Sequence, residues 1–167
     1  QITWSDSTRN MLEKGTKIQY NPSDICDSQY RPFTKQKLYF NKQLNHRTYQ
    51  MKKIYPKSDA KNLIIGVSGI GNNKALSCFI SDMVPCFDML GKSQCFPLYY
   101  YEENKRDMPS LFEEGTKCTR KDGVTDFILK QAQGLYGKKV TKEDIFFFFY
   151  GCMYLSYYFA VYGVDLK

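Results

Sequence analysis

The amino-acid sequence predicts an α+β fold, a single domain with a mixed, largely antiparallel sheet and flanking helices. Three observations lead to this prediction. The chain has 167 residues, the length of one compact domain. Residues 37–101 contain several short runs in which apolar residues alternate with polar ones or are β-branched, as in strands. Residues 5–14 and the last third of the chain instead carry the start and stop signals of helices.

Three helices are expected, near residues 5–14, 123–136 and 142–151. Each follows a residue whose side chain can cap the first turn, and the first two precede a glycine that can end a helix. The capping residues are Ser5 or Asp6, Asp122 or Thr125, and Thr141. The third start signal is the strongest, because Asp144 stands three residues after Thr141 and completes a capping box.

The strands are predicted from apolar periodicity. Residues 37–41 and 47–53 alternate polar and apolar side chains around a turn, which predicts a strand pair. A β-branched run at residues 63–67 and the segments 76–80 and 95–101 are expected to complete the sheet. The charged connector that follows, up to residue 122, is expected to be a mobile loop.

Positive charge is concentrated in one segment. The chain has 24 Lys and Arg residues against 17 Asp and Glu residues, a net charge of +7. No acidic residue occurs between Asp27 and Asp59, whereas that segment holds eight Lys or Arg residues. The rest of the chain has 16 basic residues and all 17 acidic ones, so this segment supplies the whole positive excess. The pattern fits a surface that faces a polyanion, and it also fits an ordinary solvated basic face.

Basic, aromatic and amide side chains are interleaved over residues 30–55. Lys and Arg neutralise phosphates, Arg, Asn and Gln make paired hydrogen bonds to base edges, and aromatic rings stack on extruded bases. The composition therefore favours a nucleic acid as partner, although alternate aromatics also fit the inward face of a strand. Chosen by residue type, the candidate phosphate contacts are Lys35, Lys37, Lys52, Lys53 and Lys74. The candidate base contacts are Gln36, Asn45, His46, Arg47 and Gln50.

The sequence contains no residue pattern that indicates a catalytic site or a metal site. The six cysteines never fall into Cys-x-x-Cys spacing and the chain has a single histidine, His46, so no zinc site is expected. The glycine-rich segment 66–74 lacks the contiguous Gly-Lys-Ser/Thr of a phosphate loop. A tight turn between strands, with glycines at positive φ, explains it better. No catalytic residue and no cofactor are therefore predicted in this chain.

The C-terminal segment at residues 145–164 carries no charge over the length of a membrane helix. Half of its residues are Phe or Tyr, and tyrosine hydroxyls are costly in a hydrocarbon core. We therefore expect no membrane contact, but a buried helix followed by a surface for another domain. Since the N-terminus shows no signal peptide, reduced thiols and a cytoplasmic location are expected.

Several motifs point to one family. Residues 30–55 contain Tyr30-Arg31-Pro32-Phe33 and Asn45-His46-Arg47-Thr48-Tyr49, and Val67-Ser68-Gly69-Ile70-Gly71 follows. Gly123-Val124-Thr125-Asp126-Phe127 and Thr141-Lys142-Glu143-Asp144-Ile145 come later, so that ordered matches run from about Trp4 to Gly151. On these motifs the sequence resembles the C-terminal target-recognition (specificity) region of the Type ISP single-polypeptide restriction-modification enzymes, also labelled predicted helicases.

This resemblance implies a function. In that family one polypeptide carries a nuclease, an ATPase motor, an N6-adenine methyltransferase and, last, a domain that reads an asymmetric DNA site. The chain is similar to part of this last domain. We therefore expect it to recognise double-stranded DNA beside upstream methyltransferase and motor domains, while S-adenosylmethionine, ATP and Mg²⁺ bind elsewhere in the full enzyme. No catalytic residue carries over.

The end of the chain departs from the family pattern. Residues 152–167 are aromatic and nearly uncharged, where the family has a charged segment. We predict that residues 1–151 are part of a DNA target-recognition domain and that residues 152–167 are a divergent aromatic tail, left by a truncated or frameshifted gene. An alternative stays open, in which the chain is an orphan fragment that acts as a protein-interaction or effector module and self-associates through this tail.

Overall fold

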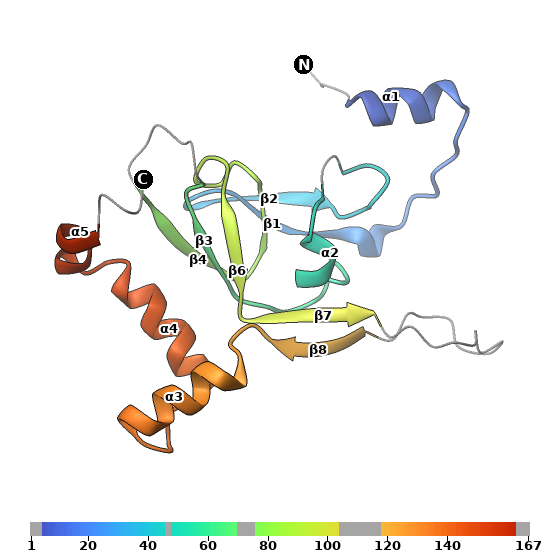
Figure 1. The fold of residues 1–167 in the computed structure, drawn as a ribbon. Helices are drawn as coiled ribbons and strands as arrows, with labels where there is room; N and C mark the ends of the chain where they lie inside the picture. The colour runs from blue at the N-terminus through green and yellow to red at the C-terminus, as the bar shows by residue number, and fades with distance from the viewer. Residues whose placement is uncertain (1–4, 46–47, 70–75, 104–117, 163–167) are drawn as a thin grey trace.

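A computed structural model describes residues 5–45, 48–69, 76–103 and 118–162. A body of short strands carries a projecting N-terminal helix and, on its other side, a group of C-terminal helices (Figure 1). The elements are α1 (Asp6–Glu13), the 3-10 turn η1 (Pro22–Asp24), β1 (Ile25–Arg31), β2 (Thr34–Tyr39), α2 (Met51–Ile54), β3 (Ile64–Val67), β4 (Cys78–Ser81), β5 (Val84–Pro85), β6 (Gln94–Pro97), β7 (Tyr99–Glu103), β8 (Cys118–Asp122), α3 (Asp126–Tyr136), α4 (Lys142–Cys152) and α5 (Ser156–Tyr162). The predicted α+β class is confirmed.

The strands form three small sheets. In the first, β1 lies between β2, which is antiparallel to it, and β5, which is parallel. In the second, β3 lies between β4 and β6 and is antiparallel to both. The third is the antiparallel hairpin of β7 and β8. The pairing is mixed and largely antiparallel, as predicted, but the predicted strand 95–101 is split at Leu98, which is buried between β6 and β7.

The predicted strand pair of residues 37–41 and 47–53 is wrong. β2 pairs with β1 instead, across a tight turn in which Phe33 has a φ of 65°. Part of the second segment forms the short helix α2. Met51 and Ile54 are three residues apart and both pack against the same core, as they do on one face of a helix. The alternation in this segment was therefore too short to separate a strand from a helical turn.

Two hydrophobic clusters hold the body together, and β3 contributes to both. The first contains Cys26, Phe40, Ile54, Tyr55, Ile64 and Val84. The second contains Ile65, Leu98 and Phe146. Because successive side chains of a strand point to opposite faces, Ile64 and Ile65 enter different clusters. Each fully buried side chain of this kind stabilises the fold by about 1.5–3 kcal/mol.

Asn62 connects three elements through one buried side chain. Its Nδ2 donates to the carbonyl oxygens of Ile54 at 3.0 Å and Tyr99 at 2.7 Å. Its Oδ1 accepts from the backbone N–H of Leu63 at 2.9 Å and from that of Tyr99 at 3.1 Å. The amide thus uses both donors and both acceptor positions. It ties the end of α2 to the start of β3 and to β7.

Close approach, not positive φ, explains two glycines of the glycine-rich segment. A Cβ at Gly66 would overlap the Met89 side chain, and one at Gly69 would overlap the carbonyl oxygen of Lys92. Neither glycine has a positive φ, so the predicted reason for them is wrong. Residues 70–75, which hold the rest of the segment, lie outside the described residues.

The predicted helix starts are confirmed. Ser5 caps α1 and Thr125 caps α3, each accepting a backbone hydrogen bond in the first turn. Thr141 and Asp144 form the predicted capping box at the start of α4, with Oγ1 of Thr141 accepting at 3.1 Å and Oδ2 of Asp144 at 2.9 Å. Local side-chain chemistry therefore defines these ends.

The predicted loop at residues 102–122 is wrong at both ends. β7 extends to Glu103 and β8 begins at Cys118, and the two strands pair with Glu103 opposite Cys118. Residues 104–117, between the two strands, lie outside the described residues.

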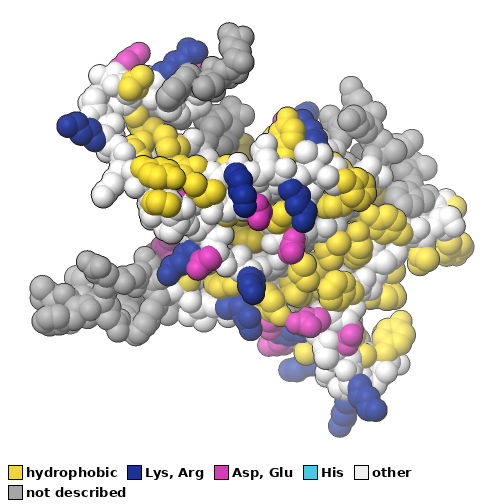
Figure 2. All heavy atoms as spheres, turned by 180° about the vertical axis from the view of Figure 1, so that it is seen from behind, with side chains coloured by type: hydrophobic (Ala, Val, Ile, Leu, Met, Phe, Trp, Pro, Cys, Tyr) yellow, Lys and Arg dark blue, Asp and Glu magenta, His cyan; other side chains and the backbone are white. Residues whose placement is uncertain are grey.

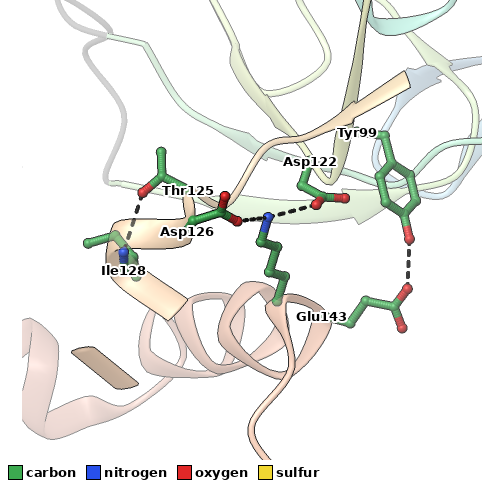
Figure 3. A network of polar contacts seen from close by, with 7 residues as sticks. Tyr99, Asp122, Thr125, Asp126, Ile128 and Glu143 are labelled. Atoms are coloured by element: carbon green, nitrogen blue, oxygen red, sulfur yellow. Dashed lines mark hydrogen bonds and ion pairs between the residues drawn. The ribbon is translucent and has the colours of Figure 1, made fainter. Parts of the chain in front are cut away.

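Polar contacts join the helical arm, which comprises α3, α4 and α5, to the β7–β8 hairpin (Figure 3). Nζ of Lys142 lies 2.7 Å from Oδ2 of Asp122 and 2.5 Å from Oδ1 of Asp126. The Tyr99 hydroxyl donates to Oε1 of Glu143 at 2.7 Å. These contacts fix the first turns of α3 and α4 against the hairpin.

Among its described residues, the aromatic C-terminal segment is buried only at its start. Ile145 and Phe146 are buried, whereas the three following phenylalanines of α4 are exposed. Among the described residues, no single helix is long and apolar enough to cross a membrane. Only α4 and α5 taken together, with a bend of 67° between them, reach the required length and composition. The division at residue 151 falls beside the end of α4 and stays a prediction.

Replacing Asn62 should destabilise the body of the fold. Asn62→Ala leaves the backbone groups of Ile54 and Tyr99 without this partner in a buried place. We expect the free energy of unfolding to fall by at least about 2 kcal/mol, measured by urea denaturation with circular dichroism. Asn10→Ala, at an exposed position of α1, is the control and should change it by less than about 0.5 kcal/mol. Equal stability of the two variants would contradict the role of Asn62.

Acid should weaken the junction of the helical arm. Hydrogen bonds hold two carboxyl pKa values below their ordinary 3.8, that of Asp126 through Lys142 and that of Asp144 through Thr141. Because both groups bind protons less readily in the folded chain, their stabilisation is present above about pH 3.8. It is lost as the pH falls further, through the folded pKa values. Urea denaturation between pH 2.5 and 6 should therefore show a smaller acid loss for Lys142→Met than for the unchanged chain; equal losses would argue against this junction.

Candidate nucleic-acid interface

An open groove of about 640 Å³ lies between the first sheet and the segment that leads into α2. Amide side chains line it above an apolar floor, and two aromatic rings stand at its edge. We call it the amide groove and define it by the amides Gln36, Asn45, Gln50 and Gln94, the floor residues Leu38, Phe40 and Met51, and the edge residues Tyr49 and Phe87. None of the described residues that line it carries a charge.

The alternation of β2 decides which candidate side chains reach the amide groove. Gln36 and Leu38 lie on the groove face of the strand. Lys35 and Lys37 project from the opposite face. Lys37 also pairs with Asp27 across the β1–β2 ladder, with Nζ 2.7 Å from Oδ1. The structure thus separates these two predicted phosphate contacts from the predicted base contact between them.

The two lysines of α2 have different surroundings. Nζ of Lys52 lies 3.9 Å from the centre of the Phe40 ring, and burial lowers the pKa of this ammonium. A cation over an aromatic face is stabilising, so Lys52 contributes to packing. Lys53 is exposed. Of the two, Lys53 is the one whose charge is fully available to a polyanion.

Two predicted base contacts, Asn45 and Gln50, meet Gln36 in the amide groove. The backbone N–H of Asn45 donates to the Asn41 carbonyl at 2.9 Å, which shapes the loop. Oδ1 of Asn45 is buried and has no hydrogen-bond partner within the described part of the chain. Gln50 directly precedes α2, and its side chain makes no capping bond there.

Three predicted contacts cannot be placed. His46 and Arg47 follow Asn45 in the sequence, and Lys74 belongs to the glycine-rich segment; all three lie outside the described residues. Their assignment as base contacts and as a phosphate contact stays a prediction.

The aromatic edge of the amide groove joins residues far apart in sequence. The Tyr49 side chain is 70% exposed and that of Phe87 is 55% exposed, with ring centres 6.1 Å apart. Tyr49 also has a φ of 43°, a conformation that a bulky residue seldom adopts and that is often associated with function. Sequence reasoning missed Phe87, because nothing local connects it with residues 30–55.

Basic side chains on one face of the molecule are mixed with acidic ones (Figure 2). On the face in Figure 2, Lys and Arg side chains lie among Asp and Glu side chains, while hydrophobic side chains gather over α4 and α5. In the basic segment, Arg31 stacks on Tyr30 at 4.7 Å and donates to the Asp88 carbonyl. The exposed lysines of this segment are Lys35, Lys37, Lys42, Lys53 and Lys57. They can attract a polyanion from several directions.

The amide groove has the chemistry of a binding site. Cys95 lines it, but burial raises the pKa of this thiol to about 11, so it is protonated at neutral pH and a poor nucleophile. The described residues contain no cluster of three or more His, Cys, Asp or Glu side chains that could hold a metal ion. What remains are neutral hydrogen-bonding groups and apolar surface.

Three solved structures are similar to the chain. The ATP-dependent Type ISP restriction-modification enzyme LlaBIII bound to DNA is 28% identical, with a TM-score of 0.78, and the match covers 99% of this chain and 10% of that chain. The DrdV–DNA complex is 31% identical, with a TM-score of 0.83, over 99% and 15% of the two chains. A nuclease-deletion mutant of the Type ISP enzyme LlaGI, in complex with a DNA substrate mimic, is 28% identical, with a TM-score of 0.72, over 98% and 13%.

The chain thus spans 10–15% of the length of these three proteins. No match is found among curated proteins. The family model of the Type ISP C-terminal specificity domain matches residues 1–167, the whole chain. The chain therefore belongs to the family of Type ISP C-terminal specificity domains.

Proposed function

We propose that the chain recognises a specific sequence of double-stranded DNA within a restriction-modification enzyme. One observation carries this proposal: the specificity-domain family matches the whole chain, and the similar LlaBIII, DrdV and LlaGI structures all hold DNA or a DNA mimic. A domain of this kind needs groups that position the phosphate backbone and groups that read base edges. The chain offers both.

The base contacts are the amides of Gln36, Asn45 and Gln50, which share the amide groove, together with His46 and Arg47, which follow Asn45 in the sequence. Asn, Gln and Arg side chains can form two hydrogen bonds with one base edge. The described lining of this groove carries no charge, so it offers neutral hydrogen-bonding groups to the base edges. These residues are therefore proposed to supply sequence preference.

The phosphate contacts are five lysines outside the described lining of the groove. Lys53 and Lys52 lie on α2, beside the groove, and Lys74 follows β3 in the sequence. Lys35 and Lys37 project from the other face of β2, so they meet phosphates where the duplex extends past this strand. Together they supply affinity that does not depend on sequence.

In a longer polypeptide, the domain holds the duplex for an N6-adenine methyltransferase and an ATP-dependent nuclease located elsewhere. S-adenosylmethionine, ATP and Mg²⁺ bind to those other parts. The ATP dependence of the similar enzyme LlaBIII supports the assignment of ATP. Such an enzyme acts on DNA in the cytoplasm, which is the location we propose.

The alternative, a free protein-interaction or effector module, is not favoured. The family model of the specificity domain matches residues 1–167, including the aromatic end of the chain. The exposed aromatic residues of α4 and α5 are compatible with contact to upstream methyltransferase and motor domains of the same polypeptide. The exposure of these aromatic residues therefore does not require a separate protein-interaction function.

Binding to duplex DNA should depend strongly on salt. With about four lysines on phosphates, the slope of log affinity against log salt should be about −3.6, or about −0.9 per contact. Fluorescence anisotropy with a pool of random duplexes measures it. Lys53→Ala should weaken binding to all sequences alike and reduce the slope by about one contact. Lys138→Ala, an exposed lysine of the helical arm, is the matched control. Salt-independent binding, or none at low salt, would overturn the proposed function.

Lys52→Ala should have a second effect that Lys53→Ala lacks. It removes the cation from the Phe40 ring, so the free energy of unfolding should fall by about 0.5–1 kcal/mol. Lys53→Ala, at an exposed position, should change it by less than about 0.5 kcal/mol. Urea denaturation of the two variants measures the difference. If both were as stable as the unchanged chain, Lys52 would be a simple surface charge.

A further inference from the structure

The lining of the amide groove restricts which base pair it can read. In the major groove of DNA, guanine is typically read by Arg or Lys at O6 and N7, and the amino group of cytosine by Asp or Glu. The described residues that line the amide groove include none of these four types. The described part of the lining therefore holds no direct reader of a G·C pair.

Adenine is the base that this lining suits. A Gln or Asn side chain donates to N7 of adenine and accepts from its amino group, forming two hydrogen bonds with one base. Gln36 and Gln50 approach the amide groove from β2 and from the start of α2. Oδ1 of Asn45 lies beside them, buried and without a partner in the described part of the chain. Because this atom is buried, the exposed amides of Gln36 and Gln50 are the ones open to a base.

The aromatic edge suits the other half of the pair. Thymine carries a methyl group in the major groove, and proteins read it by apolar contact. Tyr49 and Phe87 hold two exposed rings 6.1 Å apart beside the amides, and Tyr49 does so at a positive φ. Exposed rings in a costly backbone conformation are best explained by a partner that covers them.

Resting on the proposed function, we infer that the amide groove reads an A·T base pair. The amide of Gln36 or Gln50 pairs with the adenine, and the rings of Tyr49 and Phe87 contact the thymine methyl group. The surrounding lysines bind the phosphates and do not distinguish the bases.

Selection from random duplexes tests the amides. The unchanged chain, Gln36→Ala and Gln50→Ala are each used to select duplexes, and circular dichroism checks that the variants fold. Gln43→Ala is the matched control, because Gln43 is an exposed amide of the same loop region that does not line the groove. We expect one A·T position in the selected sites to become degenerate in at least one of the two groove variants. Discrimination there should fall by about 5- to 150-fold, while Gln43→Ala keeps it.

Modified DNA tests the contact without altering the protein. Replacing thymine by uracil at that position removes only the methyl group, and the affinity of the unchanged chain should fall about fourfold. Replacing adenine by 7-deazaadenine removes the N7 acceptor and should weaken binding further. The same replacements at other selected positions are the controls.

The outcomes separate this inference from the proposed function. Selected sites without a fixed A·T position, or one that neither groove variant relaxes, would overturn the inference and leave sequence-specific binding in place. An A·T position that tolerates both base replacements would do the same. If no duplex is selected at all, the proposed function and the inference are both overturned.

Discussion

The buried amide of Asn62 is the interaction on which the arrangement of the elements depends. It makes four hydrogen bonds to the backbone, which link the end of α2, the start of β3 and the start of β7. One of these bonds is buried and the other three are partly buried, so a backbone group left without its partner would cost up to about 1–3 kcal/mol. Since α2 carries one wall of the amide groove and β7 carries the junction with the helical arm, a single side chain sets the positions of both.

Affinity and sequence preference are assigned to different surfaces. The described lining of the amide groove is neutral, whereas the exposed lysines lie outside it, on α2 and on the opposite face of β2. Lysines that contact phosphates bind any duplex, while amides that contact base edges need particular bases. Under the proposed function, the lysines bind any duplex and the amides of the groove read one base pair.

Helices and strands differed in how well they could be predicted. The starts of α1, α3 and α4 follow from hydrogen bonds between residues at most three positions apart, so capping residues were sufficient to locate them. The pairing of β1 with β2 escaped prediction because residues 25–31 show no apolar alternation. The hydrogen bonds of Asn62 were not predicted either, because its partner Tyr99 lies 37 residues further along the chain.

Short-range chemistry in the chain defines the helix ends, the basic segment and the motifs of the family. It also predicts Gln36, Asn45 and Gln50 as base contacts, and the structure brings all three into one groove. The pairing of strands that are far apart in the sequence decides how the other residues of the site are arranged. The alternation of β2 turns Lys35 and Lys37 away from those amides, and the parallel pairing of β1 with β5 is what brings Phe87 near Tyr49. Such contacts depend on strand partners distant in sequence, and local residue patterns carry no information about them.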